Sequence, residues 1–312
     1  IKTFFNGKTS IEVDFKRFSF SETKHINRFI DYAHLRSNKQ RIQKLFIEKN
    51  NPLSLFSYHE DNGLLTINDS TNTAYSIEIK DFNNNTTSVH IPIFGVYQKP
   101  LKKTSIPNSF TYVNASEPTL LEDQSIRVEI PAHALYDDVY LDFNVKNDTL
   151  KIHQPHIPLK KSITIKFDVS HFEPKDLTYL YIGSISDYGR LCYTSTNRKG
   201  TTLTARTKYF GKYTLGRDDK GPNITPVNFK NGSWLTKYRY LKVKISDDIS
   251  GIRNFRATVN GKWILMEYDA KTNMLTHDFN DNVVIDLKNN LKLMVTDNVG
   301  NSSKFEAIFY RK

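Results

Sequence analysis

Histidine is the residue type best suited to metal or acid-base chemistry, because zinc hydrolases use two or three closely spaced His or carboxylate ligands and leave a position open for water. The nine histidines are His25, His34, His59, His90, His133, His153, His156, His171 and His277. None belongs to a His-x-His or HExxH pattern. His153 and His156 stand three apart, but Pro155 between them excludes a regular helical face. A turn or strand edge therefore suits this pair better than a metal site.

The chain has one cysteine, Cys192, in the stretch GRLCYTST, so no internal disulfide can form. We expect it to be a small buried hydrophobe, since a nucleophilic cysteine needs a neighbouring base and the sequence shows no such motif. There is also no Gly-rich phosphate loop and no G-x-S-x-G motif. We therefore predict no catalytic and no cofactor-binding residue in this chain.

Two acidic turns offer clustered oxygens of the kind that calcium prefers. Asp247 and Asp248 lie in SDDISGI, and Asp297 lies in TDNVGN. Asp and Asn in turns also cap the backbone with their own side chains. The three aspartates are candidate calcium ligands, with backbone capping as the alternative, and no other metal-binding residue is predicted.

The strands next to these turns form a repeat. YSIEIKDFNNNTTSVHIPI (residues 75–93) and LKLMVTDNVGNSSKFEAIFYRK (residues 291–312) both place alternating apolar residues before a turn rich in Asp and Asn. Period-two alternation indicates half-buried strands, so each stretch predicts a hairpin. IKTFFNGK at residues 1–8 matches FRATVNGK at residues 255–262, and Asn-Gly is the strongest short hairpin signal. We interpret the two regions as copies of one module.

The first copy carries an insertion with one predicted helix, at about residues 21–36. Ile26, Phe29 and Ile30 recur at helical spacing, and Ser19 with Glu22 fits a capping box, although Ser21 could also begin the helix. An amphipathic helix of this kind packs on its own sheet, or else its Phe29 and Ile30 dock a partner.

The predicted fold class is all-β: tandem Ig-like or β-sandwich modules, with one helical insertion in the first. Short alternating strands about every ten residues predict a middle β-sandwich over 98–217, entered through a linker at 97–110 and followed by a C-terminal Ig-like module over 218–312. Residues 1–97 are then a partial Ig-like module without its first strands. We expect the chain to be the C-terminal part of a longer protein.

The net charge is +11, which raises nucleic acid and anionic surfaces as partners. The charges are scattered and gather only in short pairs, such as Lys102 with Lys103 and Lys160 with Lys161. A nucleic-acid module would collect them in a stripe or interleave them with stacking aromatics. We therefore expect a solvated basic surface or attraction to an anionic envelope polymer, and no nucleic acid. No apolar run is long enough for a transmembrane segment.

Two stretches of the C-terminal module, ATVNGKWILMEYD and VTDNVGN, are the strongest part of a family resemblance. With FSFSETKHINRFIDYAHL and RIQKLFIEKNNPLS near the N-terminus, they resemble the C-terminal Ig-like accessory region of bacterial LytM or lysostaphin-type zinc metallopeptidases, which are peptidoglycan endopeptidases. The zinc ligands of that family lie in an His-x-x-x-Asp segment and a later His-x-His, and neither occurs here. The resemblance implies an accessory region with zinc only in an upstream catalytic domain.

From this resemblance we expect a non-catalytic region that positions or docks its enzyme in the cell envelope, either periplasmic or associated with the outer membrane. The implied partners are the upstream catalytic domain and peptidoglycan or envelope proteins. Two alternatives remain. One is a structural subunit of an envelope assembly, and the other is a glycan-binding or adhesion module that uses Trp234 and Trp263, although alternation around Trp263 favours burial in the core.

Overall fold

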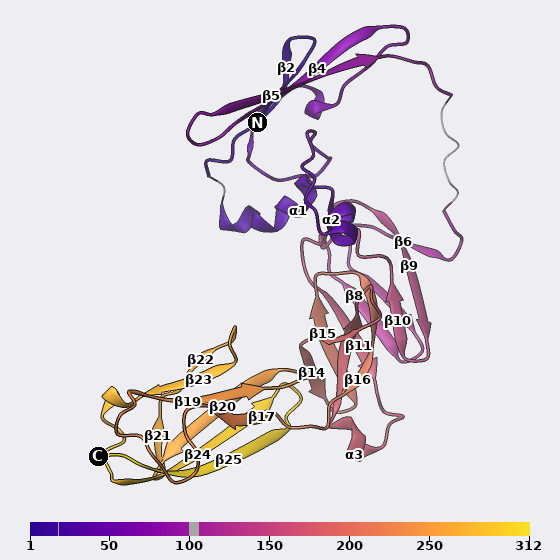
Figure 1. Cartoon of the computed structure of the whole chain (residues 1–312). Coiled ribbons are helices and arrows are strands. Elements are labelled where there is room, and N and C mark those ends of the chain that lie inside the picture. The colour runs from indigo at the N-terminus through magenta and orange to yellow at the C-terminus, as the bar shows by residue number, and fades with distance from the viewer. Residues whose placement is uncertain (18, 100–105) are drawn as a thin grey trace.

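The computed structural model describes residues 1–17, 19–99 and 106–312. It is predominantly β, with a small helical insertion near the N-terminus, as predicted. Figure 1 shows three parts, which we call the N-terminal unit (residues 1–99), the middle sandwich (106–218) and the C-terminal sandwich (219–312). Asp218 is counted with the middle sandwich because its backbone N donates to the Tyr179 carbonyl at 2.9 Å. The predicted linker, with Lys102 and Lys103, lies largely outside the described residues.

The N-terminal unit has a single five-stranded sheet in the order β3-β2-β1-β4-β5. Its helical insertion lies between β2 and β3, and in Figure 1 it stands between this sheet and the middle sandwich. The elements are β1 (Lys2–Phe5), β2 (Lys8–Val13), η1 (Phe20–His25), α1 (Ile26–Phe29), α2 (Tyr32–Asn38), β3 (Phe56–His59), η2 (Asp61–Gly63), β4 (Asn72–Lys80) and β5 (Thr86–Phe94).

The middle sandwich packs a six-stranded sheet, β13-β12-β16-β10-β9-β6, on a five-stranded sheet, β14-β15-β11-β8-β7. Alternating residues such as Ile163, Ile165 and Phe167 are fully buried between them, as period-two patterning requires. The elements are β6 (Phe110–Val113), β7 (Thr119–Asp123), β8 (Ile126–Ile130), β9 (Val139–Lys146), β10 (Thr149–Ile152), β11 (Ile163–Asp168), α3 (Pro174–Leu177), β12 (Leu180–Ile185), β13 (Leu191–Tyr193), β14 (Thr196–Lys199), β15 (Thr202–Thr207) and β16 (Gly211–Arg217).

The C-terminal sandwich packs a four-stranded sheet, β17-β19-β23-β22, on a five-stranded sheet, β18-β25-β24-β20-β21. Leu241 and Val243 of the first sheet share one core with Leu291 and Leu293 of the second. The elements are β17 (Asn223–Pro226), β18 (Ser233–Trp234), β19 (Tyr240–Ser246), β20 (Ile252–Val259), β21 (Lys262–Ile264), β22 (Glu267–Asp269), β23 (Met274–Asp278), η3 (Phe279–Asp281), β24 (Lys288–Asp297) and β25 (Ser302–Tyr310).

The strand order shows the repeat that the sequence predicts. Strands β2-β1-β4-β5 of the N-terminal unit correspond to β21-β20-β24-β25 of the C-terminal sandwich. Both predicted Asn-Gly turns are present: Asn6 and Gly7 have φ of 49° and 78°, and Asn260 and Gly261 have φ of 48° and 82°. Positive φ at both central residues is the type I′ pattern that joins twisted antiparallel strands. The predicted hairpins β4–β5 and β24–β25 also form.

The insertion does not form one continuous helix over residues 21–36, and this detail of the prediction is wrong. Ser19 is the N-cap of η1, and its backbone N donates to the Glu22 carboxylate at 3.0 Å. Ile30 is extended, with φ of −115° and ψ of 162°, and bridges to Gln43. Asp31 then caps a new helix by accepting from the backbone N of His34 at 2.9 Å. Pairing of Ile30 with Gln43 therefore interrupts a pattern that is helical in sequence.

Phe29 packs on the unit's own sheet, where it is buried with Ile11, Val13 and Leu55. Ile30 is also buried. These two side chains therefore support the packing interpretation of the insertion, and they are not accessible for the docking role.

Two further predictions about single residues are wrong. Cys192 is exposed, because β13 is a three-residue edge strand on which Leu191 and Tyr193 take the half-buried positions. Trp263 is 57% exposed. It sits opposite Thr258 in the ladder, while the next pair, Ala257 with Ile264, faces the core, so the phase of the alternation turns Trp263 outward.

Candidate functional site

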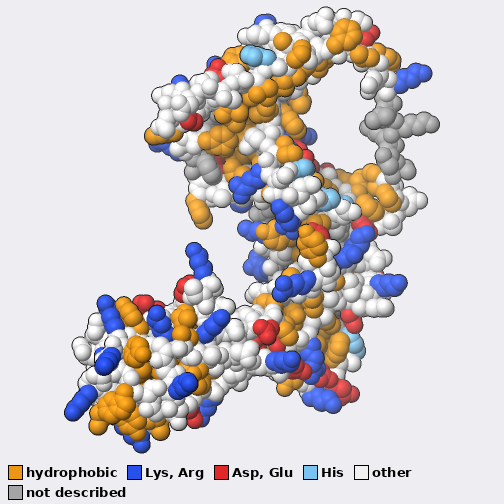
Figure 2. All heavy atoms as spheres, viewed as in Figure 1, with side chains coloured by type: hydrophobic (Ala, Val, Ile, Leu, Met, Phe, Trp, Pro, Cys, Tyr) orange, Lys and Arg blue, Asp and Glu red, His pale blue; other side chains and the backbone are white. Residues whose placement is uncertain are grey.

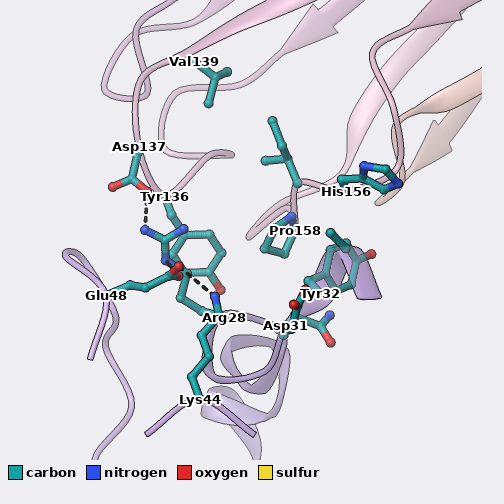
Figure 3. A pocket seen from close by; sticks show the side chains of 13 residues that line it. Arg28, Asp31, Tyr32, Lys44, Glu48, Tyr136, Asp137, Val139, His156 and Pro158 are labelled. Atoms are coloured by element: carbon teal, nitrogen blue, oxygen red, sulfur yellow. Dashed lines mark hydrogen bonds and ion pairs between the residues drawn. The ribbon is translucent and has the colours of Figure 1, made fainter. Parts of the chain in front are cut away.

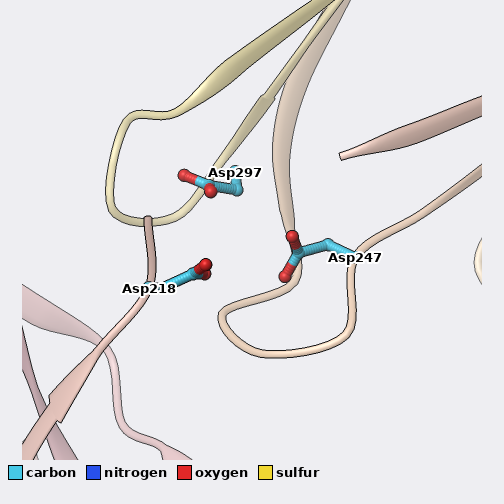
Figure 4. Close-up of side chains that lie close together, drawn as sticks. All are labelled: Asp218, Asp247 and Asp297. Carbon is cyan, nitrogen blue, oxygen red and sulfur yellow. The ribbon is translucent and has the colours of Figure 1, made fainter. Parts of the chain in front are cut away.

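Three aspartates converge where the middle sandwich joins the C-terminal sandwich (Figure 4). Asp218 directly follows β16, Asp247 follows β19, and Asp297 is the last residue of β24. One carboxylate oxygen from each lies within 4.8 Å of the others. Asp218 and Asp297 are buried, at 1% and 0% exposure, and Asp247 is partly buried. Strand ends from two sandwiches therefore bring three acidic groups to one point.

The Asp297 carboxylate closes the β24–β25 turn. Its Oδ1 accepts from the backbone N of Val299, Gly300 and Asn301 at 3.0, 2.6 and 2.8 Å, and its Oδ2 accepts from Asn301 Nδ2 at 2.7 Å. Asp247 similarly accepts from the backbone N of Gly251 at 2.6 Å. Backbone capping, one of the two roles predicted for these residues, is thus present at both turns.

The same network links the two sandwiches. Asn301 Nδ2 also donates to the backbone carbonyl of Asp218 at 2.9 Å. Asp218 Oδ2 in turn accepts from the backbone N of Ser250 at 3.2 Å. The residue that ends the middle sandwich is therefore bonded to both loops that carry the other two aspartates.

Burial raises the pKa of Asp297, the hydrogen bonds from Asn301 and Gly300 oppose this rise, and the nearby Asp218 adds to it. Within the described residues, no Lys, Arg or His forms an ion pair with any of the three carboxylates. The repulsion between these carboxylates is reduced either by a proton that two of them share or by a bound cation that takes oxygen ligands, as Ca²⁺ does. Asp218, Asp247 and Asp297 are the residues that could hold such a cation.

Of the sequence-predicted calcium candidates, the structure brings Asp247 and Asp297 together and leaves Asp248 exposed outside the cluster. Asp218 takes its place, and the sequence analysis missed it. Its signal was the GRDDKGP stretch, an acidic pair at the boundary between two predicted modules. Long-range proximity at a module junction is not visible in local spacing.

A second polar cluster joins the N-terminal unit to the middle sandwich, and it is centred on Arg28 of α1 (Figure 3). Arg28 Nε lies 2.8 Å from Glu48 Oε2, and a terminal nitrogen of the same guanidinium donates to the Asp137 carboxylate. That guanidinium also lies over the Tyr136 ring, 5.2 Å from its centroid. An arginine that bridges two carboxylates has a planar set of donors that lysine cannot reproduce.

Tyr136 and Asn50 complete this joint. His25 Nδ1 and Tyr136 Oη share a hydrogen bond of 2.6 Å, and Asn50 Nδ2 donates to the Tyr136 carbonyl and to Asp137 Oδ1, both at 3.0 Å. Burial raises the pKa of Tyr136 to about 12 and lowers the pKa of His25. Both groups are therefore neutral at physiological pH and act as hydrogen-bonding partners.

A cavity of about 220 Å³ lies beside Arg28 at this joint. Figure 3 shows Asp31, Tyr32 and Pro158 on one side and Tyr136 and Asp137 on the other. Lys44 and Arg28, the cations of its wall, are both paired with Glu48. The positive charges of this wall are thus compensated by the chain itself.

His153 and His156, for which the sequence favours a turn or strand edge over a metal site, do not share one site. His153 lies edge-on to Phe110 and Phe210, and burial lowers its pKa. His156 approaches Ser37 Oγ at 3.4 Å. The two rings have separate surroundings, which agrees with the predicted turn role.

The fold and the two joints define a protein of two tandem β-sandwiches, preceded by the single-sheet N-terminal unit. Residues 111–218 match the family model of the Zu5-like domain, which covers most of the middle sandwich. No curated protein matches the chain.

Two solved structures are similar to parts of this chain. One is the endo-beta-1,4-mannanase from Thermotoga petrophila, at 12% identity over 30% of this chain and 20% of that chain, with a TM-score of 0.26. The other contains the fibronectin(III)-like modules of Clostridium thermocellum CbhA, at 11% identity over 49% of this chain and 86% of that chain, with a TM-score of 0.24. Likeness at this level carries no functional argument.

Proposed function

We propose that this chain is a non-catalytic accessory region that keeps the modules of a longer cell-envelope protein at fixed positions. The observation that carries the proposal is the pair of polar joints: Arg28 between the N-terminal unit and the middle sandwich, and the Asp218–Asn301 network between the two sandwiches. Both joints are only partly buried, with the Arg28 side chain 15% exposed and that of Asp137 36% exposed. Breaking either joint still leaves a partly desolvated polar group without its partner, which favours one relative orientation of the modules. A flexible linker has no such penalty.

The parent protein that we propose is a zinc metallo-endopeptidase of the LytM or lysostaphin type that acts on peptidoglycan. This part rests on the sequence resemblance, with ATVNGKWILMEYD and VTDNVGN as its strongest strings. The proposed partners are its catalytic domain, which would carry the zinc, and peptidoglycan or envelope proteins. Among the described residues, no helix combines the length and the apolar character needed to cross a bilayer.

Small-angle X-ray scattering of the chain tests the fixed arrangement. We expect one conformer with the geometry of Figure 1 to fit the wild-type curve, and Arg28→Ala to broaden the distance distribution. Arg41→Ala is the matched control, because Arg41 lies in the same insertion, is exposed and carries the same charge. Circular dichroism of each variant shows whether the sheets stay folded. A wild-type curve that requires an ensemble of module orientations contradicts the proposal.

Intact-mass measurement of the native protein tests the parent enzyme separately. We expect a species well above 36.2 kDa, with a His-x-His peptide upstream of Ile1. A larger species whose upstream peptides lack paired zinc ligands would remove the metallo-endopeptidase assignment and leave the fixed arrangement unaffected.

A further inference from the structure

The outer face of the five-stranded sheet in the C-terminal sandwich combines exposed aromatic rings with positive charge. Trp263 on edge strand β21 and Trp234 on edge strand β18 are 57% and 59% exposed. Trp234 stacks on Tyr310 of β25, with ring centroids 5.2 Å apart and an interplanar angle of 29°. Both tryptophans of the chain therefore lie in one sheet, at its opposite edges.

The strand register places Lys292 in the row of Trp263 and Lys288 opposite Tyr310. Trp263 pairs with Thr258, Thr258 with Lys292, and Lys292 with Glu306, so these side chains form one row across the outer face. The adjacent row on that face contains Arg256, Met294 and Lys304. Directly opposed residues on neighbouring strands point to the same side of a sheet, and the rows lie one period of two residues apart.

The charge of this face is positive. Lys304 is paired with Glu306 at 2.5 Å. Arg256, Lys288 and Lys292 are exposed, and none of them forms an ion pair within the part of the chain that the structure describes. Figure 2 shows Lys and Arg side chains spread among hydrophobic ones over the C-terminal sandwich.

We propose that this outer face binds an anionic polysaccharide. The negative π faces of tryptophan and tyrosine suit the C–H faces of sugar rings, and Arg256, Lys288 and Lys292 complement carboxylate or phosphate groups along the same chain. Four strand spacings separate β21 from β18, about 19 Å, so the platform has the length of an oligosaccharide of several units. This inference goes beyond the proposed role of keeping modules at fixed positions and does not depend on it.

Charge density favours a polysaccharide over a nucleic acid. Duplex DNA has one negative charge per ~1.7 Å of axis, and its binding proteins neutralise many phosphates at once. Here the three cations without an ion-pair partner among the described residues lie on two neighbouring strands, Arg256 on β20 and Lys288 and Lys292 on β24. Lys288 and Lys292 are four residues apart on one strand, which corresponds to about 13 Å. A polymer with widely spaced charges matches this face better.

Titration of the full chain with polygalacturonate tests the proposal, with tryptophan fluorescence as the readout because both tryptophans lie on this face. We expect saturable binding that weakens with added salt. Trp263→Ala and Lys292→Gln, followed by calorimetry, should each weaken binding about tenfold: the first loses a ring contact with a sugar face and the second loses one charge-assisted contact. Tyr188→Ala and Lys199→Gln are the matched controls, because both residues are exposed on the middle sandwich.

Absence of binding, or equal binding by all four variants, overturns the proposal. Equal affinity for neutral dextran also overturns it, because the cations would then have no role. Tighter binding of poly(dT) than of polygalacturonate would assign the face to nucleic acid. The Arg28 joint is not involved in any of these results, so they are separable from the scattering test.

Discussion

The N-terminal unit and the C-terminal sandwich share a strand order and a turn, but among the residues that the structure describes only the second has a covering sheet. Leu291, Leu293 and Val295 on β24 are buried against the core that β19 completes. In the N-terminal hairpin, Ile79, Val89 and Ile91 are 46%, 47% and 39% exposed. The same local pattern therefore yields a core strand in one module and a half-open face in the other, so burial is decided by what lies opposite.

The turns of the two hairpins sharpen this comparison. Asn85 donates its backbone N and Nδ2 to Asp81 at 2.8 and 2.7 Å, and Asn301 does the same to Asp297 at 2.8 and 2.7 Å. These bonds lower the pKa of Asp81. Burial raises the pKa of Asp297 despite the same bonds. The same turn geometry is thus accompanied by a lowered aspartate pKa in the exposed turn and a raised one in the buried turn.

Truncation at matched positions should give the largest difference. Leu293→Ala removes a fully buried side chain, and we expect it to cost ~2 to 5 kcal/mol in the free energy of unfolding of the C-terminal sandwich. Ile77→Ala, at the corresponding site of β4, removes a half-buried side chain and should cost less than about half as much. Denaturant unfolding followed by tryptophan fluorescence reports only the C-terminal sandwich, so Ile77→Ala should leave that transition in place. A shift of equal size in both variants would mean that the two modules unfold as one.

The Asn-Gly turns should respond equally in both modules. Gly7 and Gly261 have φ of 78° and 82°, and an added Cβ meets no atom within 4 Å at either site. Gly7→Ala and Gly261→Ala should therefore each cost about 1 to 2 kcal/mol through backbone strain alone. Hydrogen exchange of the strands that flank each turn measures the free-energy cost of each substitution. A clearly larger cost at Gly261 would show that the covering sheet also constrains the turn.

The smallest expected effect is the pH dependence of the two turn carboxylates. The folded-state pKa of Asp81 lies below the ordinary value of 3.8, so its stabilising contribution is present above pH 3.8 and is lost as the pH falls further. The folded-state pKa of Asp297 lies above 3.8, so this group favours the folded state at low pH, and that contribution is lost as the pH rises through its folded pKa. NMR titration of the carboxyl carbons should place the two midpoints on opposite sides of 3.8.

Repeating that titration with calcium chloride distinguishes an aspartate cluster that binds a cation from one that shares a proton. A cation bound by Asp218, Asp247 and Asp297 lowers the Asp297 pKa, because it stabilises the ionised form. A proton shared within the cluster leaves this pKa raised whatever the calcium concentration.

Local sequence was sufficient for the parts of the fold that local chemistry decides. Alternation predicted the strands, and Asn-Gly predicted the turns at residues 6–7 and 260–261, because only a few residues tolerate positive φ. The interruption of the helix at Ile30 was not predictable, because it depends on a β-bridge to Gln43. The side of the sheet on which Trp263 lies was not predictable either, because it depends on pairing with Thr258. At the candidate site, Asp247 and Asp297 were predicted from turn composition. Asp218 joins them only through the packing of two sandwiches.

Hydrogen exchange of the whole chain, read by mass spectrometry, tests most directly whether the covering sheet sets the stability of each hairpin. The β24–β25 amides should exchange only on global opening of the C-terminal sandwich, and the β4–β5 amides, whose apolar face is half open, should exchange orders of magnitude faster. Equal protection of the two hairpins would contradict the account, because the shared strand order and turn would then be sufficient without a covering layer.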